Sequence, residues 1–201
     1  MAGSASKSFT LILLAMSFYF NSISAARVAP KSSTEFIRTS CSTTTYPKLC
    51  YNSLSSHSST IQTSPKLLVN EALHVTLSSA KSTSVKMSSL SHSHGLKPRE
   101  VSAMKDCVEV LRDAVTEIRK SIDELGHDKQ SDFRLMINNV QTWVSAAMTD
   151  ESTCSDGFEE TGMNGNLKTA VRERIVHIAQ LTSNALALIN NYGVLHDERI
   201  F

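Results

Sequence analysis

The chain has 201 residues, of which 20 are basic and 19 acidic, and its hydrophobic share is 41%. A net charge of +1 excludes binding to nucleic acid or anionic membranes through overall charge, so any charged recognition needs a local patch. Once an N-terminal targeting segment is set aside, about 175 residues remain, which predicts one domain with a sizeable core and no second domain.

The N-terminus has the layout of a secretory signal peptide. Lys7 precedes the apolar run Phe9–Phe20, and small residues follow at Ser24–Ala26. The run is shorter than the roughly 20 apolar residues of a membrane-spanning helix, which favours cleavage near Ala26. We therefore expect residues 1–26 to be removed and residues 27–201 to be secreted as one domain. An uncleaved anchor, giving a membrane-tethered interaction module, is the alternative.

A short helical hairpin is expected next, over residues 34–57. Cys41 and Cys50 flank Tyr46-Pro47, where proline begins a new helix after a Ser/Thr-rich bend, so a disulfide could close the hairpin. The stretch 55–64 has Ser, His and Thr without apolar periodicity and predicts a linker.

Four amphipathic helices are expected within residues 64–193, separated by breakers at Gly95, Pro98, Gly126 and 157–165. The second has a continuous seam at steps of three and four, formed by Val101, Met104, Val108, Leu111, Val115, Ile118, Ile122 and Leu125. The first turns serine-rich after Val75 and is the weakest. The third is expected from about Ser131 to Thr149, and the fourth has an apolar stripe from Leu167 to Tyr192. Such helices bury their stripes against one another, which predicts an all-α, up-down-up-down four-helix bundle behind the hairpin.

The other two cysteines fit that bundle. Cys107 and Cys154 lie almost equidistant from the polar turn 126–131, so an antiparallel helix pair brings their sulfurs together. Four cysteines formally allow three pairings, and these geometric arguments favour Cys41–Cys50 and Cys107–Cys154. No CxxC or HExxH pattern supports a metal site instead.

Sequence motifs for catalysis are lacking. The chain has no GxSxG and no glycine-rich phosphate loop, and His92 and His94 are interpreted as a solvated helix end, so neither a cofactor nor a metal is predicted. An enzyme is the least favoured class. The second bundle helix instead carries an acidic stripe, Asp106, Glu109, Asp113 and Glu117, which is either a solvated face or a docking surface for a basic partner. Trp143 is expected at the core or its boundary.

Four runs of sequence closely resemble the plant invertase/pectin methylesterase inhibitor family. They are CSTTTYPKLCYNSL (41–54), AMKDCVEVLRDAVTEIRKSIDEL (103–125), NVQTWVSAAMTDESTCSDGF (139–158) and LTSNALALI (181–189). The resemblance implies a secreted four-helix bundle after a helical hairpin, with first-to-second and third-to-fourth disulfides. It also implies an enzyme inhibitor without activity of its own.

The resemblance favours the pectin methylesterase inhibitor subgroup. Invertase inhibitors are expected to carry Pro-Lys-Phe before the third bundle helix, whereas this chain reads Gln130-Ser131-Asp132-Phe133. An inhibitor of acid invertase, a beta-fructofuranosidase, is therefore the alternative. Similar bundles also occur as N-terminal pro-regions of pectin methylesterases, which is a further alternative.

For the favoured subgroup, the resemblance implies a one-to-one complex that covers the enzyme's substrate cleft and so regulates pectin methylesterification in the plant cell wall. The implied partner-binding positions are Glu109, Asp113, Thr116, Gln141, Thr153 and Asp156. Thr116 stands where some members have an acidic residue, which removes one charge contact. Glu109 and Asp113 also belong to the acidic stripe, so helical spacing and resemblance select the same face. Carboxylates at the interface predict an affinity that changes with pH.

Overall fold

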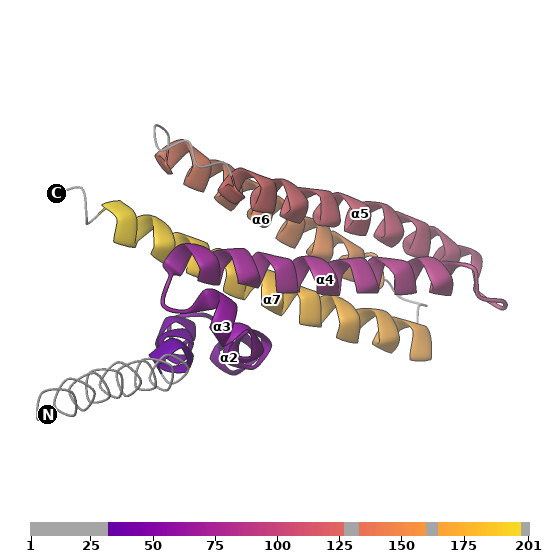
Figure 1. Cartoon of the computed structure of the whole chain (residues 1–201). Coiled ribbons are helices and arrows are strands. Elements are labelled where there is room, and N and C mark those ends of the chain that lie inside the picture. The colour runs from indigo at the N-terminus through magenta and orange to yellow at the C-terminus, as the bar shows by residue number, and fades with distance from the viewer. Residues whose placement is uncertain (1–31, 127–132, 160–164, 198–201) are drawn as a thin grey trace, which may run out of the picture.

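Four long helices form the body of the molecule in this computed structural model, which describes residues 32–126, 133–159 and 165–197. They are α4 (Pro65–Ser91), α5 (Pro98–Gly126), α6 (Phe133–Asp156) and α7 (Asn166–Asp197), and successive helices run in opposite directions (Figure 1). Each helix packs against two others, in the pairs α4–α5, α5–α6, α6–α7 and α4–α7. The predicted four-helix bundle is confirmed, and no strand occurs within the described ranges.

Some expectations concern residues outside these ranges. The described residues do not include the predicted signal peptide (1–26), most of the turn 126–131, or residues 130–132 before α6. Among the described helices, none combines the length and apolar content that crossing a bilayer requires.

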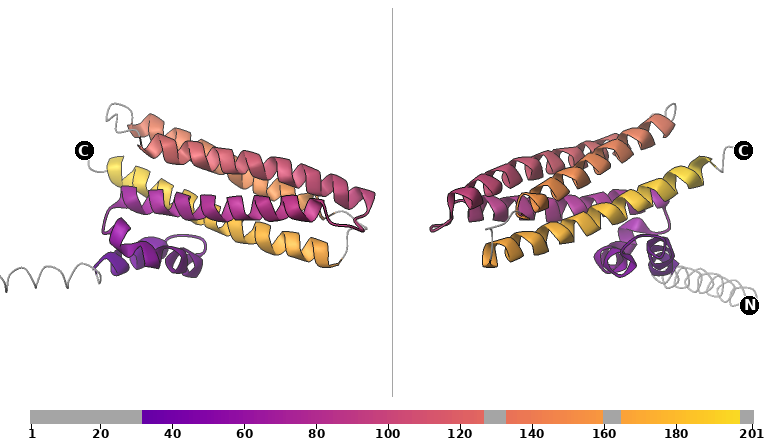
Figure 2. Two further views of the ribbon diagram at one scale, coloured as in Figure 1. Left: turned by 45° about the vertical axis from the view of Figure 1, so that its right-hand side comes forward. Right: turned by 180° about the vertical axis from the view of Figure 1, so that it is seen from behind.

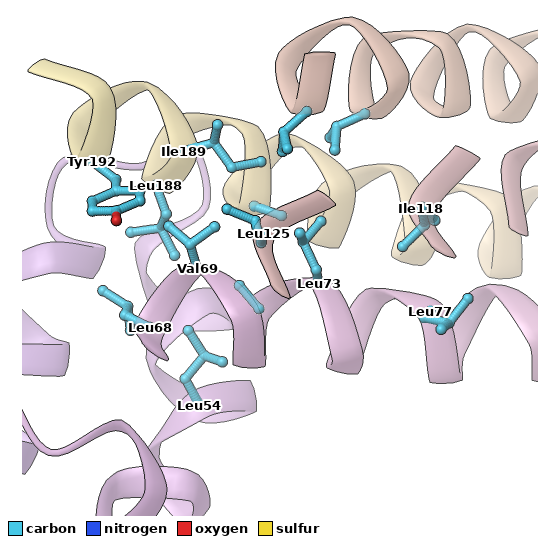
Figure 3. Packing of buried hydrophobic residues seen from close by; sticks show 14 of the residues in the cluster. Leu54, Leu68, Val69, Leu73, Leu77, Ile118, Leu125, Leu188, Ile189 and Tyr192 are labelled. Carbon is cyan, nitrogen blue, oxygen red and sulfur yellow. The ribbon is translucent and has the colours of Figure 1, made fainter. Parts of the chain in front are cut away.

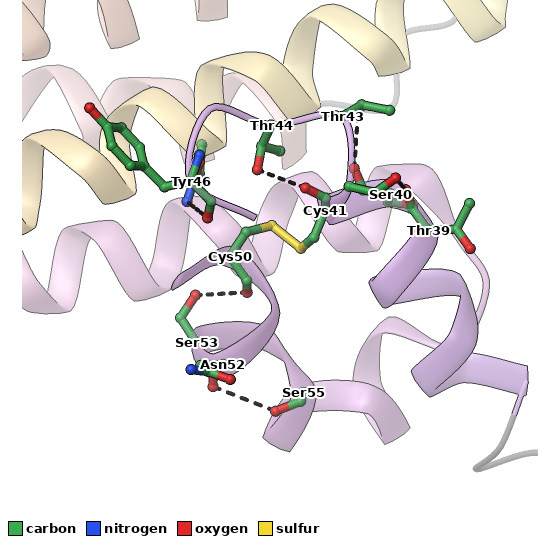
Figure 4. Close-up of a disulfide and its surroundings, with 12 residues drawn as sticks. Thr39, Ser40, Cys41, Thr43, Thr44, Tyr46, Cys50, Asn52, Ser53 and Ser55 are labelled. Carbon is green, nitrogen blue, oxygen red and sulfur yellow. Dashed lines mark hydrogen bonds between the residues drawn. A yellow bond between two sulfur atoms is a disulfide. The ribbon is translucent and has the colours of Figure 1, made fainter. Parts of the chain in front are cut away.

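A smaller helical unit precedes the bundle and lies against α4 and α7 (Figure 2). Residues 32–41 are helical, and α2 (Pro47–Leu54) returns from the bend with proline in its first turn. The Cys41–Cys50 disulfide closes this hairpin with a Cα–Cα distance of 5.6 Å (Figure 4). The prediction of a hairpin closed by the first two cysteines is confirmed.

The predicted linker 55–64 is wrong, because the chain continues as helix. A single turn, η1 (Ser55–His57), leads into α3 (Ser58–Ile61), and the helix ends at Gln62 with a φ of +52°. One apolar side chain explains the difference, since Ile61 is fully buried in the core. A single buried residue leaves no periodicity to read in a serine-rich sequence.

Asn184 of α7 holds this N-terminal unit on the bundle. Its side chain is buried, and it both accepts from the backbone N–H of Tyr46 and donates to the carbonyl of Tyr46, each at 3.0 Å. Leu54 and Ile61 extend the contact by joining Leu68, Leu73 and Leu188 in one apolar cluster. Figure 3 shows how side chains from α2, α4, α5 and α7 meet in this cluster.

The buried face of α5 is wider than the predicted seam. Met104, Val108, Leu111, Ile118 and Leu125 are buried as expected, but Ala114 and Ser121 are buried as well, while Val115 and Ile122 are only half-buried. A helix that packs on both α4 and α6 needs a broader stripe than the narrow seam of a two-stranded coiled coil.

Side-chain caps set the starts of α4 and α5. The Ser64 hydroxyl accepts from the N–H of Leu67 at 3.3 Å, with Pro65 as the first helical residue. At α5, the Glu100 carboxylate accepts from the N–H of Lys97 at 2.8 Å, which is half of a capping box. The Ser64 cap helps the serine-rich α4 to form despite its weak pattern, and α4 extends over 27 residues.

The second disulfide joins the first half of α5 to the C-terminal end of α6. Cys107 of α5 and Cys154 of α6 are buried and bonded, with 4.3 Å between their Cα atoms. The predicted pairing is confirmed, and both cysteine pairs are used. The bond fixes the relative height of α5 and α6 and therefore the surface that the two helices form together.

Candidate docking surface on α5 and α6

The outer face of α5 presents three of the predicted contact residues. Glu109, Asp113 and Thr116 are all exposed, as is Asp106 of the acidic stripe. They lie there because successive residues turn by 100°, which places them opposite the buried stripe of Met104, Leu111 and Ile118. Three of the four residues of the acidic stripe are therefore exposed, and the fourth, Glu117, is half-buried.

The C-terminal part of α6 presents two more. Thr153 and Asp156 are exposed, whereas Cys154 between them and Glu151 before them are buried. The predicted third bundle helix ended near Thr149, but α6 continues to Asp156, so both contact residues lie on the helix itself.

The register of α5 against α6 places these two groups at one height. The Cys107–Cys154 bond sets the register, and a hydrogen bond of 2.9 Å from Asn139 of α6 to Glu124 of α5 agrees with it nearer the opposite end of the helix pair. In an antiparallel pair with this register, Glu109 lies level with Thr153 and Asp113 with Asp150. Five of the six predicted residues therefore share one end of the α5–α6 face.

Gln141 lies apart from this group. It is half-buried on the α7 side of α6, and its amide donates to the side-chain oxygen of Asn190 at 2.8 Å. Twelve residues separate it from Thr153, which is about 18 Å along a helix axis. Gln141 would contact a partner only if that partner reached well along α6 towards α7.

Asp150 is a further carboxylate of this candidate surface, and the sequence reasoning missed it. Its pKa lies above its usual value, first because it is partly buried and then because Asp113 and Glu117 of α5 are close enough to repel its charge. A helical projection of α6, combined with the register set by Cys107–Cys154, was the signal that could have found it. We call Glu109, Asp113, Glu117 and Asp150 the carboxylate surface.

Basic side chains border this surface. Lys120 forms a 2.8 Å salt bridge with one oxygen of Glu117, and the other oxygen of Glu117 is buried without a hydrogen-bond partner. Glu109 lines a hollow of about 500 Å³ together with Lys105, Arg112 and, from the end of α4, His92. The negative charge is thus concentrated towards α6, beside Asp150.

The two threonines in the group can act as acceptors. The Thr116 hydroxyl donates to the carbonyl of Arg112, and that of Thr153 donates to the carbonyl of Thr149, both at 2.9 Å. Their protons are used within the helix, so their oxygens are left to accept from a donor on a partner. Threonines and carboxylates together suit a partner surface rich in donors.

Another hollow, of about 750 Å³, lies away from this surface. Residues of α2, η1, α4 and α7 line it, among them His57, His74 and His177, and none of its lining residues comes from α5 or α6. His57 is already paired with Glu71 at 2.9 Å. Within the described residues, no group of His, Cys, Asp and Glu is arranged to hold a metal.

The remaining sequence interpretations can be placed as well. His92 is the C-cap of α4, and its ring nitrogen lies 2.7 Å from the carbonyl oxygen of Ser88. Trp143 is half-buried. Neither residue belongs to the carboxylate surface.

A four-helix bundle with two disulfides and a docked helical hairpin, with an acidic surface beside one disulfide, defines a class of small binding proteins. Comparison with known proteins gives the class its name. Residues 35–188 match the family described as plant invertase/pectin methylesterase inhibitor, and the chain belongs to that family of enzyme inhibitors.

Individual relatives agree with this assignment. The chain is 45% identical to "Pectinesterase inhibitor 11" from Arabidopsis thaliana, covering 91% of this chain and 94% of that protein. It is also 45% identical to a "21 kDa protein" from Daucus carota, covering 87% and 91% of the two chains. The crystal structure of a mutant pectin methylesterase inhibitor from Arabidopsis has the same fold, with a TM-score of 0.61 at 22% identity over 75% of this chain and 92% of that one.

Proposed function

We propose that this chain is a secreted inhibitor of pectin methylesterase that binds the enzyme one-to-one and covers its substrate cleft. In the plant cell wall such a complex regulates pectin methylesterification. The inhibitor acts by steric occlusion and undergoes no turnover.

One observation carries the choice of surface. All six contact positions inferred from family resemblance lie on α5 and α6, which the Cys107–Cys154 bond fixes in register, and five of them are exposed: Glu109, Asp113, Thr116, Thr153 and Asp156. Rigid helices present such groups more reliably than loops do, so little order has to be gained on binding.

The chemistry of the surface indicates how the partner is held. Exposed carboxylates at positions 109 and 113 accept charge-assisted hydrogen bonds from lysine or arginine beside the cleft. Asp150 adds a third carboxylate within range of Asp113. Electrostatic complementarity of this kind sets orientation and association rate more than it sets final affinity.

A titration of activity tests the function. The oxidised mature protein, residues 27–201, is added in steps to a plant pectin methylesterase and, separately, to a plant acid invertase near pH 5.5. We expect methylesterase activity to fall linearly to a break at one inhibitor per enzyme, with invertase unaffected. Loss of invertase activity alone would show that the alternative target is correct.

A further inference from the structure

Glu151 is a buried acid that the docking surface does not use. It lies on α6, has no exposed area, and is three residues before Cys154. One of its oxygens, Oε1, accepts from the Thr182 hydroxyl of α7 at 2.7 Å, and the other, Oε2, is buried with no hydrogen-bond partner. No salt bridge within the described residues reaches it. A carboxylate in such a place would be an unpaired buried charge.

The hydrogen bonds of Thr182 indicate where the proton lies. Its hydroxyl has one proton but two oxygens within donating distance, Glu151 Oε1 at 2.7 Å and the carbonyl oxygen of Ile178 at 3.0 Å. If the carboxyl is neutral, its O–H donates to the Thr182 oxygen, and the Thr182 hydroxyl then donates to Ile178. Both contacts become hydrogen bonds at once, which an ionised Glu151 does not allow.

The charged surroundings favour the same state. On α6 itself, the neighbour that acts on Glu151 is Asp150, which carries like charge. The α5 carboxylates Asp113 and Glu117 act in turn on Asp150. From α7, the Thr182 hydroxyl acts on Glu151. Burial, followed by Asp150, raises the pKa of Glu151 from its ordinary value of 4.5 to about 8, against the opposing effect of the Thr182 hydrogen bond.

We propose that Glu151 acts as a neutral carboxylic acid that positions the last turns of α6 against α7, so that Thr153 and Asp156 are held more firmly in an acidic or neutral medium than in an alkaline one. The first part concerns the folded chain alone. The link to Thr153 and Asp156 rests on the proposed function, because it assumes that these residues contact the partner.

The direction of the pH effect follows from proton uptake. Because the folded protein binds this proton more tightly than the unfolded chain does, Glu151 favours folding most below pH 4.5. That contribution is lost as the pH rises from 4.5 towards 8. Over this range, one such group raises the unfolding equilibrium constant by up to about tenfold per pH unit.

A pair of variants isolates this contribution. Glu151→Gln keeps the shape and supplies a neutral donor to Thr182, whereas Glu173→Gln changes an exposed glutamate on α7 in the same way. Urea unfolding of the oxidised protein at pH 5, 6, 7 and 8 should show a pH-dependent loss of stability for wild type and Glu173→Gln. Glu151→Gln should lose much less. Asp150→Asn should keep a steep dependence, which separates the two neighbouring acids.

A titration of the unaltered protein keeps the proposal testable if Glu151→Gln fails to fold. The carboxyl carbon of Glu151, followed by NMR, should titrate near pH 8. Amide exchange in residues 150–156, corrected for intrinsic rates, should quicken between pH 5 and 8. A midpoint below about 5.5, or equal pH slopes in wild type and Glu151→Gln, would overturn the proposal. None of these readouts needs an enzyme partner, so they stand apart from the proposed function.

Discussion

The buried side chain of Asn184 helps to fix the position of the N-terminal hairpin on the bundle. Its two hydrogen bonds with the backbone of Tyr46 are part of what joins the N-terminal hairpin to α7. A buried amide of this kind is satisfied only when the hairpin is docked, so it specifies one arrangement of the two units.

Replacing Asn184 by alanine should therefore loosen the hairpin. The Tyr46 N–H and carbonyl lose their partner, and we expect the free energy of unfolding to fall by about 2 kcal/mol. Thermal unfolding and amide exchange in residues 47–61 measure the effect. Asn191→Ala is the matched control, since Asn191 is exposed and its bond to Thr43 is solvent-accessible. Equal losses in the two variants would contradict this role for Asn184.

At this scale the sequence predicted that Glu109 and Asp113 share one helix face, but it did not predict the acidic residues packed beside them. Helical spacing alone places Glu109 and Asp113 together on the outer face of α5. Asp150 could not be assigned in this way, because its position depends on how α6 is turned and set against α5. Glu151 reads in the sequence as one more surface acid, and only tertiary packing shows that it is buried.

Among the elements, α5 and α6 form the unit that presents the site. The Cys107–Cys154 bond closes a span of 47 residues, and the Cys41–Cys50 bond closes one of 9. In the loop-entropy account these two bonds contribute about 4 and about 2.5 kcal/mol to stability.

Removing each bond should reveal that difference. Cys107→Ala with Cys154→Ala should lower the free energy of unfolding by about 4 kcal/mol, and Cys41→Ala with Cys50→Ala by about 2.5 kcal/mol. Urea unfolding at fixed pH provides both values. A larger loss from the hairpin pair would mean that docking of the hairpin, and not loop length, governs its contribution.

Helices with strong periodicity were predictable, and those stabilised by a few tertiary contacts were not. The apolar stripe from Leu167 to Tyr192 predicted α7 because it repeats over many turns. The helical stretch 55–61 has one buried anchor, Ile61, and therefore no repeat. The sequence also failed to predict that α6 continues to Asp156, because Thr and Ser in this stretch suggest a helix end. Burial of Glu151 and of the disulfide-bonded Cys154 shows that this stretch packs as part of the helix.

On the scale of the whole molecule, the bundle acts as a rigid support for one charged face. The N-terminal unit packs on α4 and α7 (Figure 2), while the proposed contact residues lie on α5 and α6, on another side of the bundle. This division leaves the carboxylate surface free of intramolecular cover at Glu109 and Asp113.

The most direct test of the account compares inhibition of pectin methylesterase by wild type, by Glu109→Ala with Asp113→Ala, and by a control pair. The control, Glu159→Ala with Glu173→Ala, also removes two exposed acids but lies outside the carboxylate surface. We predict that the first pair weakens inhibition at least tenfold, mainly through slower association at low salt, while the control stays within about twofold of wild type. Equal inhibition by all three proteins would contradict the assignment of this face as the docking surface.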